Sequence, residues 1–312
     1  MIVSKLKSAV RNVIPAPELQ YTSIEYRKKK LKKFYKLRMG NDLNLDNPKL
    51  FNEKMQWYKL YYTHPDMKRC VDKIDFKDYV RELIGEGCTA KIIAIWNSPD
   101  EVSIKDIKAK KYVIKSTLQS DGNFIYLVTD ADSLDIPSIE QEIKNKWFDT
   151  RLLLTNSYCS AYYGAKPRVV IEEFIEEFAN AANDYKLFCF NGKPAFFYVA
   201  EDHFKNGENQ NVYPITFFDL EWNPMEVHYG EHTVNPDVKK PVHFEEMIEL
   251  AKKLSEPFPF VRVDFFDTPN KLYLAELTFY PGGGLVEYSP SSFNKKMGDM
   301  LDLSRFADNL YS

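Results

Sequence analysis

The stretch from Phe260 to Gly284, FVRVDFFDTPNKLYLAELTFYPGGG, decides the fold that we expect for this chain. It predicts two strands joined by a short turn, because the DTPN segment at 267–270 is rich in residues that favour turns. The three glycines that end it, 282–284, let the backbone approach a ligand closely. Side chains alternate between the two faces of a strand, so residues spaced by two share a face. The hairpin therefore carries a conspicuous polar set: Arg262, Asp264, Glu276 and Thr278.

The register of this hairpin determines which of these groups meet. If Phe266 pairs with Leu272, then Arg262 lies opposite Glu276, and Asp264 lies diagonal to it at about 7–8 Å. Leu272 then shares the face of Glu276. Buried charges are costly unless they are paired or bind a metal, and oxygen ligands at this spacing suit Mg²⁺. A structural pair of Arg262 and Glu276, with Asp264 at a solvated edge, is the alternative.

The composition of the whole chain is that of a globular protein with one or two domains. It has 312 residues and a formal net charge of −3, so charge gives no argument for nucleic-acid binding. The 4 cysteines are scattered without a CxxC pair, which indicates neither a zinc site nor a disulfide framework. No apolar run reaches the roughly 18 residues that span a bilayer, and no signal peptide is indicated. We therefore expect a cytoplasmic protein.

Helical and strand patterns are mixed along the chain and predict an α+β fold. Helices are expected at 48–62, 72–84, 138–148 and 243–254. Strands are expected at 91–96, where a buried strand is predicted, and at 111–115, 124–128, 169–171, 185–190 and 195–199. Gly85 is the expected C-cap of the second helix, and Ser138 with Gln141 forms the expected cap of the third. The predicted division is a helical extension (1–65), an N-terminal subdomain (66–110), a first lobe (111–184) and a second lobe with the hairpin (185–312).

Two segments near the N-terminus carry clustered positive charge. Residues 1–14 place apolar side chains at helical spacing, and the helix either packs on the domain or lies on a membrane surface. Residues 27–38, RKKKLKKFYKLR, form a dense basic run. Such a run is either one solvated helix face or a surface that meets an anionic polymer or lipid headgroups. Residues 1–38 are therefore the candidate for peripheral contact with a membrane or an anionic polymer.

Four separated segments carry groups that suit triphosphate chemistry. Lys73 lies near a predicted helix start, and Lys115 ends a strand before the polar loop at 117–123. The run EEFI at 172–175 follows an apolar strand, with Asp184 and Lys186 beyond it. Binding a nucleoside triphosphate needs lysines for phosphate oxygens, carboxylates for Mg²⁺ and an apolar slot for the base. Together with the hairpin, these segments predict a nucleotide site.

In this order the segments resemble an ATP-grasp enzyme, and in particular the TupA-like ATP-grasp family of polysaccharide biosynthesis. The motifs that carry the resemblance are FNEKMQW at 51–57, DYKLFCFNGK at 184–193, FPFVRVDFF at 258–266 and LAELTFYPGGG at 274–284. The likeness extends from Phe51 to about Leu303. It implies the ATP-grasp fold, in which two antiparallel-sheet lobes close on ATP.

The resemblance also implies a role for each group. The nucleotide contacts would be Lys73, Lys115, Gly122, Glu172, Glu173, Phe174, Ile175 and Asp184. Glu172 would meet the adenine amino group, and Asp184 would lie near the ribose. The ligands of Mg²⁺, expected as two ions, would be Asp264, Glu276 and Thr278. Arg262 would act on the transferred phosphoryl group, and Lys186 would serve either the γ-phosphate or the substrate carboxylate. The acylphosphate site would be lined by Gly282, Gly283 and Gly284.

Two positions depart from the ATP-grasp pattern. Thr278 stands where these enzymes generally place asparagine, so its metal contact would run through water. The loop that covers the phosphates, TLQSDGN at 117–123, has only Gly122 as a flexible position and adds Asp121. A carboxylate near phosphates is repulsive unless a metal or an amine intervenes. Weaker nucleotide binding, or Asp121 facing the acceptor amine, would follow.

The activity implied by the resemblance is carboxylate–amine ligation through an acylphosphate. The expected substrates are a uronic acid or related sugar carboxylate and an amino acid or amine, in capsule or surface polysaccharide assembly. One alternative is a sugar-nucleotide glycosyltransferase, because Asp130-Ala131-Asp132 follows an apparent strand as a DxD metal motif would. A second alternative is a nucleotide-binding module without catalysis, suggested by the glycine-poor covering loop.

Overall fold

The computed structural model describes residues 21–118, 124–150, 158–179, 183–201, 204–205, 208–210 and 212–304. The helix expected at 1–14 and the covering-loop residues Asp121 and Gly122 lie outside these described residues.

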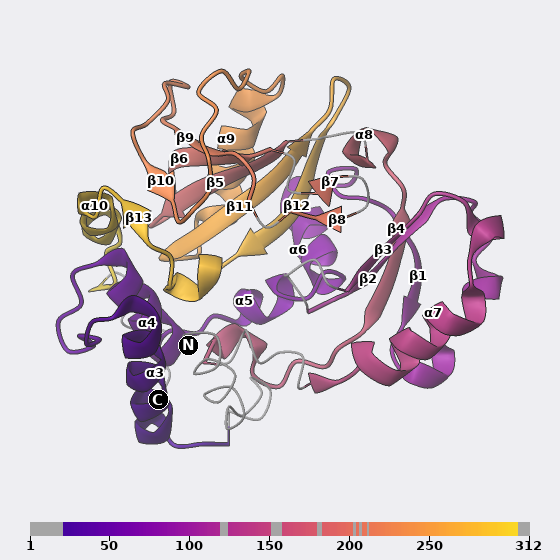
Figure 1. Cartoon of the computed structure of the whole chain (residues 1–312), viewed down its shortest axis with the longest axis horizontal. Helices are drawn as coiled ribbons and strands as arrows, with labels where there is room; N and C mark the ends of the chain where they lie inside the picture. Colours follow the sequence, from indigo (N-terminus) through magenta and orange to yellow (C-terminus); the bar gives the residue numbers. More distant parts are fainter. Residues whose placement is uncertain are drawn as a thin grey trace.

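Two antiparallel sheets form two lobes (Figure 1), as the α+β prediction requires. The first sheet has the order β1-β4-β2-β3, with β1 Ile92–Trp96, β2 Tyr112–Ser116, β3 Ile125–Val128 and β4 Val169–Glu173. The second has the order β12-β11-β5-β6-β9, with β5 Asp184–Phe190, β6 Lys193–Ala200, β9 Ile215–Phe218, β11 Phe260–Asp267 and β12 Leu272–Thr278. Two short pairs complete the described strands: β7 (Phe204–Lys205) with β8 (Glu208–Asn209), and β10 (His228–Tyr229) with β13 (Tyr288–Ser289).

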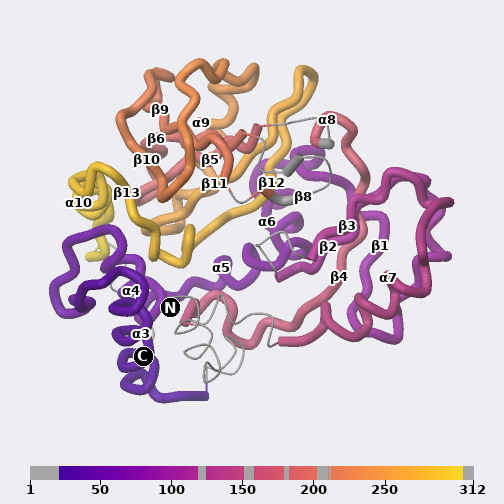
Figure 2. Tube along the Cα trace, viewed as in Figure 1, coloured from indigo at the N-terminus to yellow at the C-terminus, as the bar shows by residue number. Residues whose placement is uncertain are grey.

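Helices surround the sheets and connect the lobes (Figure 2). Their bounds are α3 Ile24–Met39, α4 Phe51–Tyr61, α5 Pro65–Cys70, α6 Asp75–Ile84, α7 Ile136–Glu142, α8 Glu176–Ala179, α9 Phe244–Ser255 and α10 Ser292–Met300. A π-helical turn, Ile143–Trp147, continues α7, and short 3₁₀ turns lie at Pro99–Glu101, Ile104–Asp106, Ala131–Ser133, Ser160–Tyr162 and Pro281–Gly284. None of the described helices combines the length and apolar character that crossing a bilayer requires.

Local sequence explains several of these elements. α9 buries Phe244, Met247, Ala251 and Leu254, whose spacing puts them on one side of a helix. That side packs on β5, β6 and β11. Gly85 caps α6 with a left-handed φ of 92°, as predicted. The N-cap of α7 is Asp135, whose carboxylate accepts from the N–H of Ser138. The sequence placed this cap at Ser138, three residues too far along the chain.

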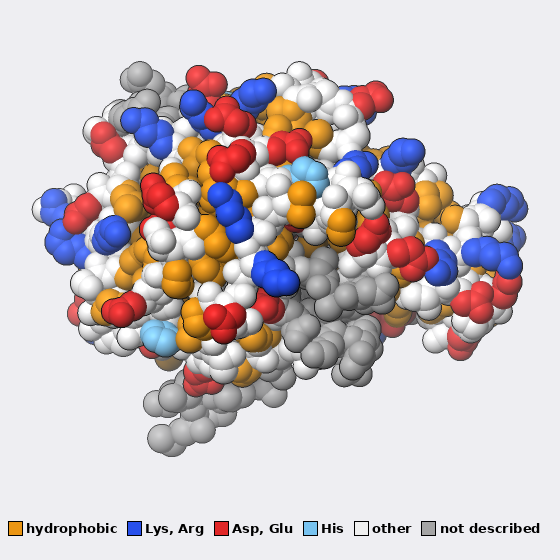
Figure 3. All heavy atoms as spheres, turned by 90° about the horizontal axis from the view of Figure 1, so that it is seen from above, with side chains coloured by type: hydrophobic (Ala, Val, Ile, Leu, Met, Phe, Trp, Pro, Cys, Tyr) orange, Lys and Arg blue, Asp and Glu red, His pale blue; other side chains and the backbone are white. Residues whose placement is uncertain are grey.

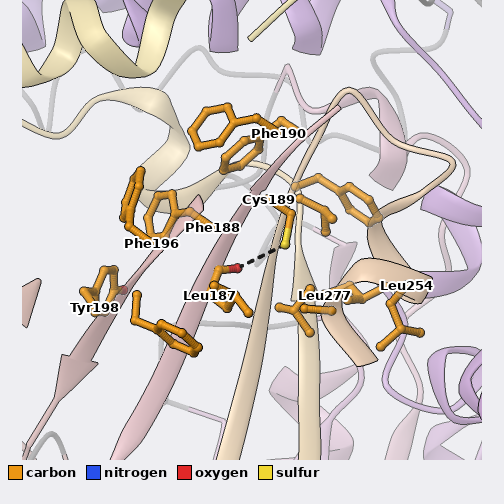
Figure 4. Packing of buried hydrophobic residues seen from close by; sticks show 14 of the residues in the cluster. Leu187, Phe188, Cys189, Phe190, Phe196, Tyr198, Leu254 and Leu277 are labelled. Atoms are coloured by element: carbon orange, nitrogen blue, oxygen red, sulfur yellow. Dashed lines mark hydrogen bonds between the residues drawn. The ribbon is translucent and has the colours of Figure 1, made fainter. Parts of the chain in front are cut away.

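The main hydrophobic core is formed by side chains of the five-stranded sheet and of the helices that pack on it, and it is rich in aromatic rings (Figure 4). Phe188 and Phe196 stack with ring centroids 4.8 Å apart, and Phe260 meets Phe188 edge to face at 5.9 Å. Burying one such ring contributes roughly 2–3 kcal/mol. Phe51 of α4 packs on Phe260 in this core. The N-terminal helices therefore share the core of the second lobe. On the face of the molecule seen in Figure 3, acidic and basic side chains are mixed.

Strand β1 differs from the sequence expectation. Its residues Ile92, Ile93 and Ile95 are 38%, 40% and 36% exposed, because β1 is an edge strand and the prediction of a buried strand was wrong. Its apolar run indicated burial, although an edge strand has a neighbour on one side only. β1 also pairs with β4, so residues 66–110 contribute a strand to the sheet of the first lobe.

The register of the β11–β12 hairpin also differs from the expected one. Phe266 pairs with Tyr273 and not with Leu272, and Asp264 faces Glu276 directly. The expected register was therefore wrong by one residue next to the turn and by two residues at the carboxylates, so a direct pair replaces the diagonal arrangement. The two carboxylates are closer neighbours than the sequence alone indicated.

A β-bulge accounts for the second residue of this shift. The pairing skips one residue between Asp264 and Phe265, which leaves Ala275 without a partner across the strands. An extra residue turns the side chains beyond it to the other face of the sheet. Leu272 and Leu274 consequently face the core, while Glu276 and Thr278 face the opposite side. In a regular strand these four residues, spaced by two, would all share one face. The bulge lets the two leucines and the two polar residues point to opposite faces.

Candidate functional site

A row of polar side chains crosses the five-stranded sheet on the face opposite α9. Glu276 of β12, Asp264 of β11, Lys186 of β5 and Tyr198 of β6 are direct neighbours from strand to strand. Opposing residues in antiparallel strands point to the same face. The fold therefore brings together Lys186, Asp264 and Glu276, which the sequence had placed in separate motifs.

Arg262 fixes the geometry of this row. Its guanidinium grips Asp264 through both carboxylate oxygens, with Nε–Oδ1 at 2.6 Å and Nη2–Oδ2 at 2.5 Å. Nη2 also donates to Oγ1 of Thr278 at 3.1 Å, and Nη1 donates to the hydroxyl of Tyr198 at 3.1 Å. Lys186 Nζ adds a third bond to Asp264, at 3.0 Å from Oδ2. The sequence did not single out Tyr198, which directly follows two other aromatic residues of β6, Phe196 and Phe197.

Burial and neighbouring charges shift the pKa values of these groups in opposite directions. Burial raises the pKa of Asp264, although Arg262 and Lys186 oppose that effect. Burial acts the same way on Glu276, but Lys186, Lys73 and Arg262 outweigh it and lower the pKa of Glu276. Burial works against the charged form of Lys186, yet Asp184 and Asp264 raise its pKa. Glu276 is thus held ionised at the end of the row, with its side chain 35% exposed.

The donor set fits Mg²⁺ in kind. Asp264, Glu276 and Thr278 offer hard oxygen atoms, and Thr278 Oγ1 lies 2.9 Å from Glu276 Oε1. A carboxylate has about four lone-pair sites, and the three bonds to Asp264 leave one of them on Oδ1. Among the described residues, no group of three or more His, Cys, Asp or Glu side chains forms a complete metal cage. Mg²⁺ commonly takes only one or two protein carboxylates and completes its shell with phosphates and water.

Two cavities lie beside the row, and Lys73 lines both of them. One lies between the lobes and opens to solvent, with a volume of about 470 Å³ that includes part of that solvent. It is lined by Lys73, Lys77, Ala90, Lys115, Glu172, Phe178, Phe266, Tyr273, Leu274 and Ala275. The other, also open to solvent, has a volume of about 560 Å³ defined in the same way and reaches Glu276, Thr278 and Tyr280. Burial lowers the pKa of Lys73, against the opposing effect of Glu276.

Glu172 lies between two lysines at the wall of the first cavity. Its Oε2 is 2.6 Å from Nζ of Lys115, and its Oε1 is 2.8 Å from Nζ of Lys77. Burial disfavours the carboxylate, but the two lysines prevail and lower the pKa of Glu172 to about 2. Sequence reasoning missed Lys77. Its position four residues after Lys73, on the same side of the predicted helix, was the available signal.

Among the other predicted nucleotide contacts, Gly122 lies outside the described residues, and the remaining four, Glu173, Phe174, Ile175 and Asp184, do not line this cavity. The Glu173 carboxylate accepts from the backbone N–H of Lys91 at 2.9 Å. Phe174 and Ile175 connect β4 to α8 and are half-buried, and Asp184 opens β5 at 3.4 Å from Lys186.

A missed residue, Phe178 of α8, supplies a ring that lines the first cavity. Its centroid lies 4.4 Å from that of Phe266 and 5.2 Å from that of Tyr273. The three rings give the cavity an apolar side. The sequence hid this contact because it depends on how the two lobes meet.

The glycine run forms a tight turn after β12. Gly282, Gly283 and Gly284 have φ values of 54°, 64° and 65°, in the left-handed region that favours glycine. The N–H of Gly283 donates to the carbonyl of Tyr280 at 2.8 Å, so that donor is used within the turn.

The segment Asp130-Ala131-Asp132, which suggested a glycosyltransferase, forms a local turn. Asp130 caps the 3₁₀ turn Ala131–Ser133, and its carboxylate accepts from the N–H of Asp132 at 3.2 Å. Asp132 lies 3.5 Å from Lys110 on an exposed surface. This arrangement explains the two aspartates as turn residues.

Comparison with known proteins points to one family. Residues 53–302 match the protein family described as TupA-like ATPgrasp. No curated protein matches the chain in sequence. The solved structures that are similar include D-alanine–D-alanine ligase from Helicobacter pylori, with 19% identity over 78% of this chain and 61% of that chain and a TM-score of 0.43. The same ligase from Bacillus anthracis complexed with ATP has 17% identity over 76% and 64% of the two chains and a TM-score of 0.41. D-alanyl-alanine synthetase A from Vibrio cholerae has 15% identity over 82% and 70%, with a TM-score of 0.45. The chain thus spans less than two thirds of the length of the first two ligases.

Proposed function

The chain belongs to the TupA-like ATP-grasp family, and from this premise we propose that it is an ATP-dependent ligase that joins a carboxylate to an amine. The observation that carries the proposal is the pair of facing carboxylates, Asp264 and Glu276, beside two cavities that share Lys73. In the proposed reaction, a carboxylate oxygen attacks the γ-phosphorus of ATP, which gives an acylphosphate and ADP. The amine then attacks the acyl carbon, phosphate leaves, and the amine nitrogen loses a proton.

Cationic side chains would stabilise the charge on the triphosphate. Lys73, Lys77 and Lys115 line the first cavity, where their charges would act on phosphate oxygens in a partly water-excluded space. Arg262 and Lys186 both contact Asp264 on the sheet. They would stabilise the phosphoryl group during its transfer. Positioning and charge neutralisation supply most of the rate in such reactions.

Asp264 and Glu276, with Thr278 beside them, would hold Mg²⁺, in the proposal as two ions. When bound, Mg²⁺ neutralises charge on phosphate oxygens and orients the reacting phosphate. Arg262 prepares this site by holding Asp264 at a fixed angle through two bonds. The covering-loop glycine, Gly122, keeps its proposed contact with the phosphates.

The apolar side of the first cavity would take the adenine ring. Phe178, Phe266 and Tyr273 present aromatic surface there, and base–aromatic stacking is worth about 1–3 kcal/mol. An adenine amino group would reach the Glu172 carboxylate only by sharing it with Lys77 and Lys115. Nearby, Glu173, Phe174, Ile175 and Asp184 keep their proposed roles along the base and ribose.

The proposed substrates are a uronic acid or related sugar carboxylate and an amino acid or other amine, joined in capsule or surface polysaccharide assembly. The family resemblance and the glycine turn at 282–284, which would face the acylphosphate, support this proposal. Both partners are small molecules or glycan ends, and nucleic acid is not among them.

Helix α3 offers a second contact surface. Lys29, Lys32 and Lys33 are exposed at spacings that put them on one side, while Leu31 and Tyr35 are buried against the domain. We propose that this side meets an anionic membrane or polymer on the cytoplasmic side of the cell. Exchanging these three lysines for glutamates should abolish co-flotation with vesicles containing phosphatidylserine. Equal flotation of both proteins would remove the membrane proposal.

The decisive experiment is a screen for ADP release with Mg–ATP, amino acids and uronic acids, with hydroxylamine added to trap an acylphosphate. We expect ADP and hydroxamate with the correct acid, and amide when the amine is added. Stabilisation against unfolding by a UDP-sugar and not by ATP would support a glycosyltransferase instead. Binding of ATP without ADP release for any pair would favour a non-catalytic nucleotide-binding module.

A further inference from the structure

Helix α4 carries an unusual buried polar stripe. Asn52, Gln56 and Lys59 follow each other at spacings of four and three residues, so they share one side of the helix. Their exposed fractions are 0%, 0% and 3%. Polar side chains at such burial need partners that compensate for the loss of water. The stripe must therefore bind something specific.

Its partner is the glycine turn that ends the metal hairpin. Gln56 Nε2 donates to the carbonyls of Gly283 at 3.1 Å and Gly284 at 2.9 Å. Lys59 Nζ donates to the carbonyl of Gly283 at 2.5 Å and to Oε1 of Gln56 at 3.1 Å. Asn52 Nδ2 donates to the carbonyl of Val286 at 2.8 Å. The helix thus holds the backbone at two carbonyls of the turn, Gly283 and Gly284, and at that of Val286 just beyond it.

The fit between helix and turn leaves no room for a side chain. A Cβ on Gly284 would lie 2.5 Å from Cβ of Met55 and 2.6 Å from Nε2 of Gln56. A peptide unit is planar and trans, so its N–H points away from the side to which its C=O points. Because the Gly283 carbonyl points to α4, the N–H of Gly284 points away from the helix. Asn52, Gln56 and Lys59, which we call the clamp, therefore orient the Gly284 N–H as well as the Gly283 carbonyl.

Lys59 brings an uncompensated charge to this clamp. Two other lysines at the site, Lys77 and Lys186, each pair with a carboxylate. No acidic side chain within the described parts of the chain pairs with Lys59, whose ammonium contacts a carbonyl and an amide oxygen only. A buried charge without a counter-ion is costly. A ligand that supplies the opposite charge would compensate it.

We propose that Lys59 and the glycine turn form an oxyanion subsite, in which the reacting carboxylate or phosphoryl group is the missing counter-ion. This inference rests on the proposed ligase function and adds to it the group that gives the turn its positive potential. Lys59 is a positioning residue here, since it acts through the Gly283 carbonyl. Oxyanions bound by backbone N–H groups gain strongly from a fixed positive charge nearby.

Lys54 provides a matched control on the same helix. Its Nζ also donates to two backbone carbonyls, Gly298 at 2.7 Å and Leu301 at 2.6 Å, but these belong to the end of α10. Lys59→Met and Lys54→Met each remove a lysine that holds two oxygen acceptors. Lys59→Gln removes the charge and keeps a donor for the Gly283 carbonyl, and it serves if Lys59→Met does not fold.

The test measures thermal unfolding of the full chain with Mg–ATP, and with orthophosphate added to Mg–ADP. In the wild type and in Lys54→Met we expect stabilisation by both. In Lys59→Met and Lys59→Gln we expect stabilisation by Mg–ATP to remain, while half-saturation by phosphate rises at least roughly tenfold, as for a lost charged interaction.

Three results would overturn the inference. Wild-type phosphate binding by Lys59→Gln would show that the charge has no role. Equal loss of both ligands in Lys59→Met and Lys54→Met would make Lys59 a purely structural residue. A wild type stabilised by Mg–ATP but not by phosphate would remove this subsite alone, whereas stabilisation by neither would also remove the proposed function.

Discussion

Exchange of Glu172 for glutamine should lower the stability of the protein by an amount that depends on pH. Glu172 is 4% exposed and forms ion pairs with Lys77 and Lys115. Its pKa falls from an ordinary value of 4.5 to about 2 in the folded protein. Each pKa unit corresponds to about 1.36 kcal/mol, so the ionised carboxylate contributes on the order of 3 kcal/mol. Glutamine keeps the shape but leaves two lysines without their counter-ion, and breaking a buried pair typically costs about 3–5 kcal/mol.

The sign of the pH dependence follows from the direction of the pKa shift. Because the folded pKa of Glu172 lies below its ordinary value, its contribution is complete above about pH 4.5 and is lost as the pH falls toward 2. About 2 kcal/mol of it should be gone by pH 3. The difference between wild type and Glu172→Gln should therefore shrink from about 3 kcal/mol at pH 7 to about 1 kcal/mol at pH 3.

Urea unfolding at both pH values measures this difference. Glu173→Gln is the control, because within the described ranges the neighbouring Glu173 side chain accepts only from the backbone N–H of Lys91, and an amide oxygen can accept that bond too. We expect it to change the free energy of unfolding by less than about 1 kcal/mol at either pH. A Glu172→Gln protein within about 1 kcal/mol of wild type at pH 7, or a difference that persists undiminished at pH 3, would refute the reasoning.

Two further predictions concern the hairpin and its turn. Glu276→Gln should abolish ADP release and leave the circular dichroism spectrum unchanged, because Glu276 lies at the partly exposed end of the row; near-normal turnover would remove it from the metal site. Gly284→Ala should lower the free energy of unfolding by more than about 2 kcal/mol, since its Cβ would lie 2.5 Å from Met55 Cβ at a φ of +65°. Gly87→Ala, at a φ of +93° with no atom within 4 Å, should cost only about 1–2 kcal/mol, and equal losses would show that crowding at the turn is unimportant.

Patterns local in sequence predicted much of the framework. The helices around Phe51–Tyr61, Asp75–Ile84 and Phe244–Ser255 were predicted and are confirmed. The strands expected at 185–190 and 195–199 are confirmed as well, as β5 and β6, which pair antiparallel. These elements depend on hydrophobic periodicity and on residues that favour caps or turns, which act over a few positions. The motifs also led to the family that the comparison confirms.

The sequence left the hairpin register open between two requirements. Leu274 and Glu276 have the spacing that puts two residues on one strand face. Leu274 must nevertheless be buried in the core, and Glu276 must reach the cavity beside the row. Only the packing of β12 against β11 and the core decides where the extra residue goes, and it is Ala275. The bulge satisfies both requirements at once, which regular alternation cannot do.

The remaining parts of the candidate site were decided by contacts between distant segments. Lys77, Lys115 and Glu172 come from α6, β2 and β4, and their ion pairs exist only because two neighbouring inner strands of one sheet meet a helix. Likewise, Lys59 and Gly283 are 224 residues apart along the chain, and no local pattern joins them. Local propensity determines helices, strands and turns because it acts between residues that are close in sequence. The partner of a buried charge is decided by tertiary packing, because only a correctly placed partner compensates the charge for its loss of water.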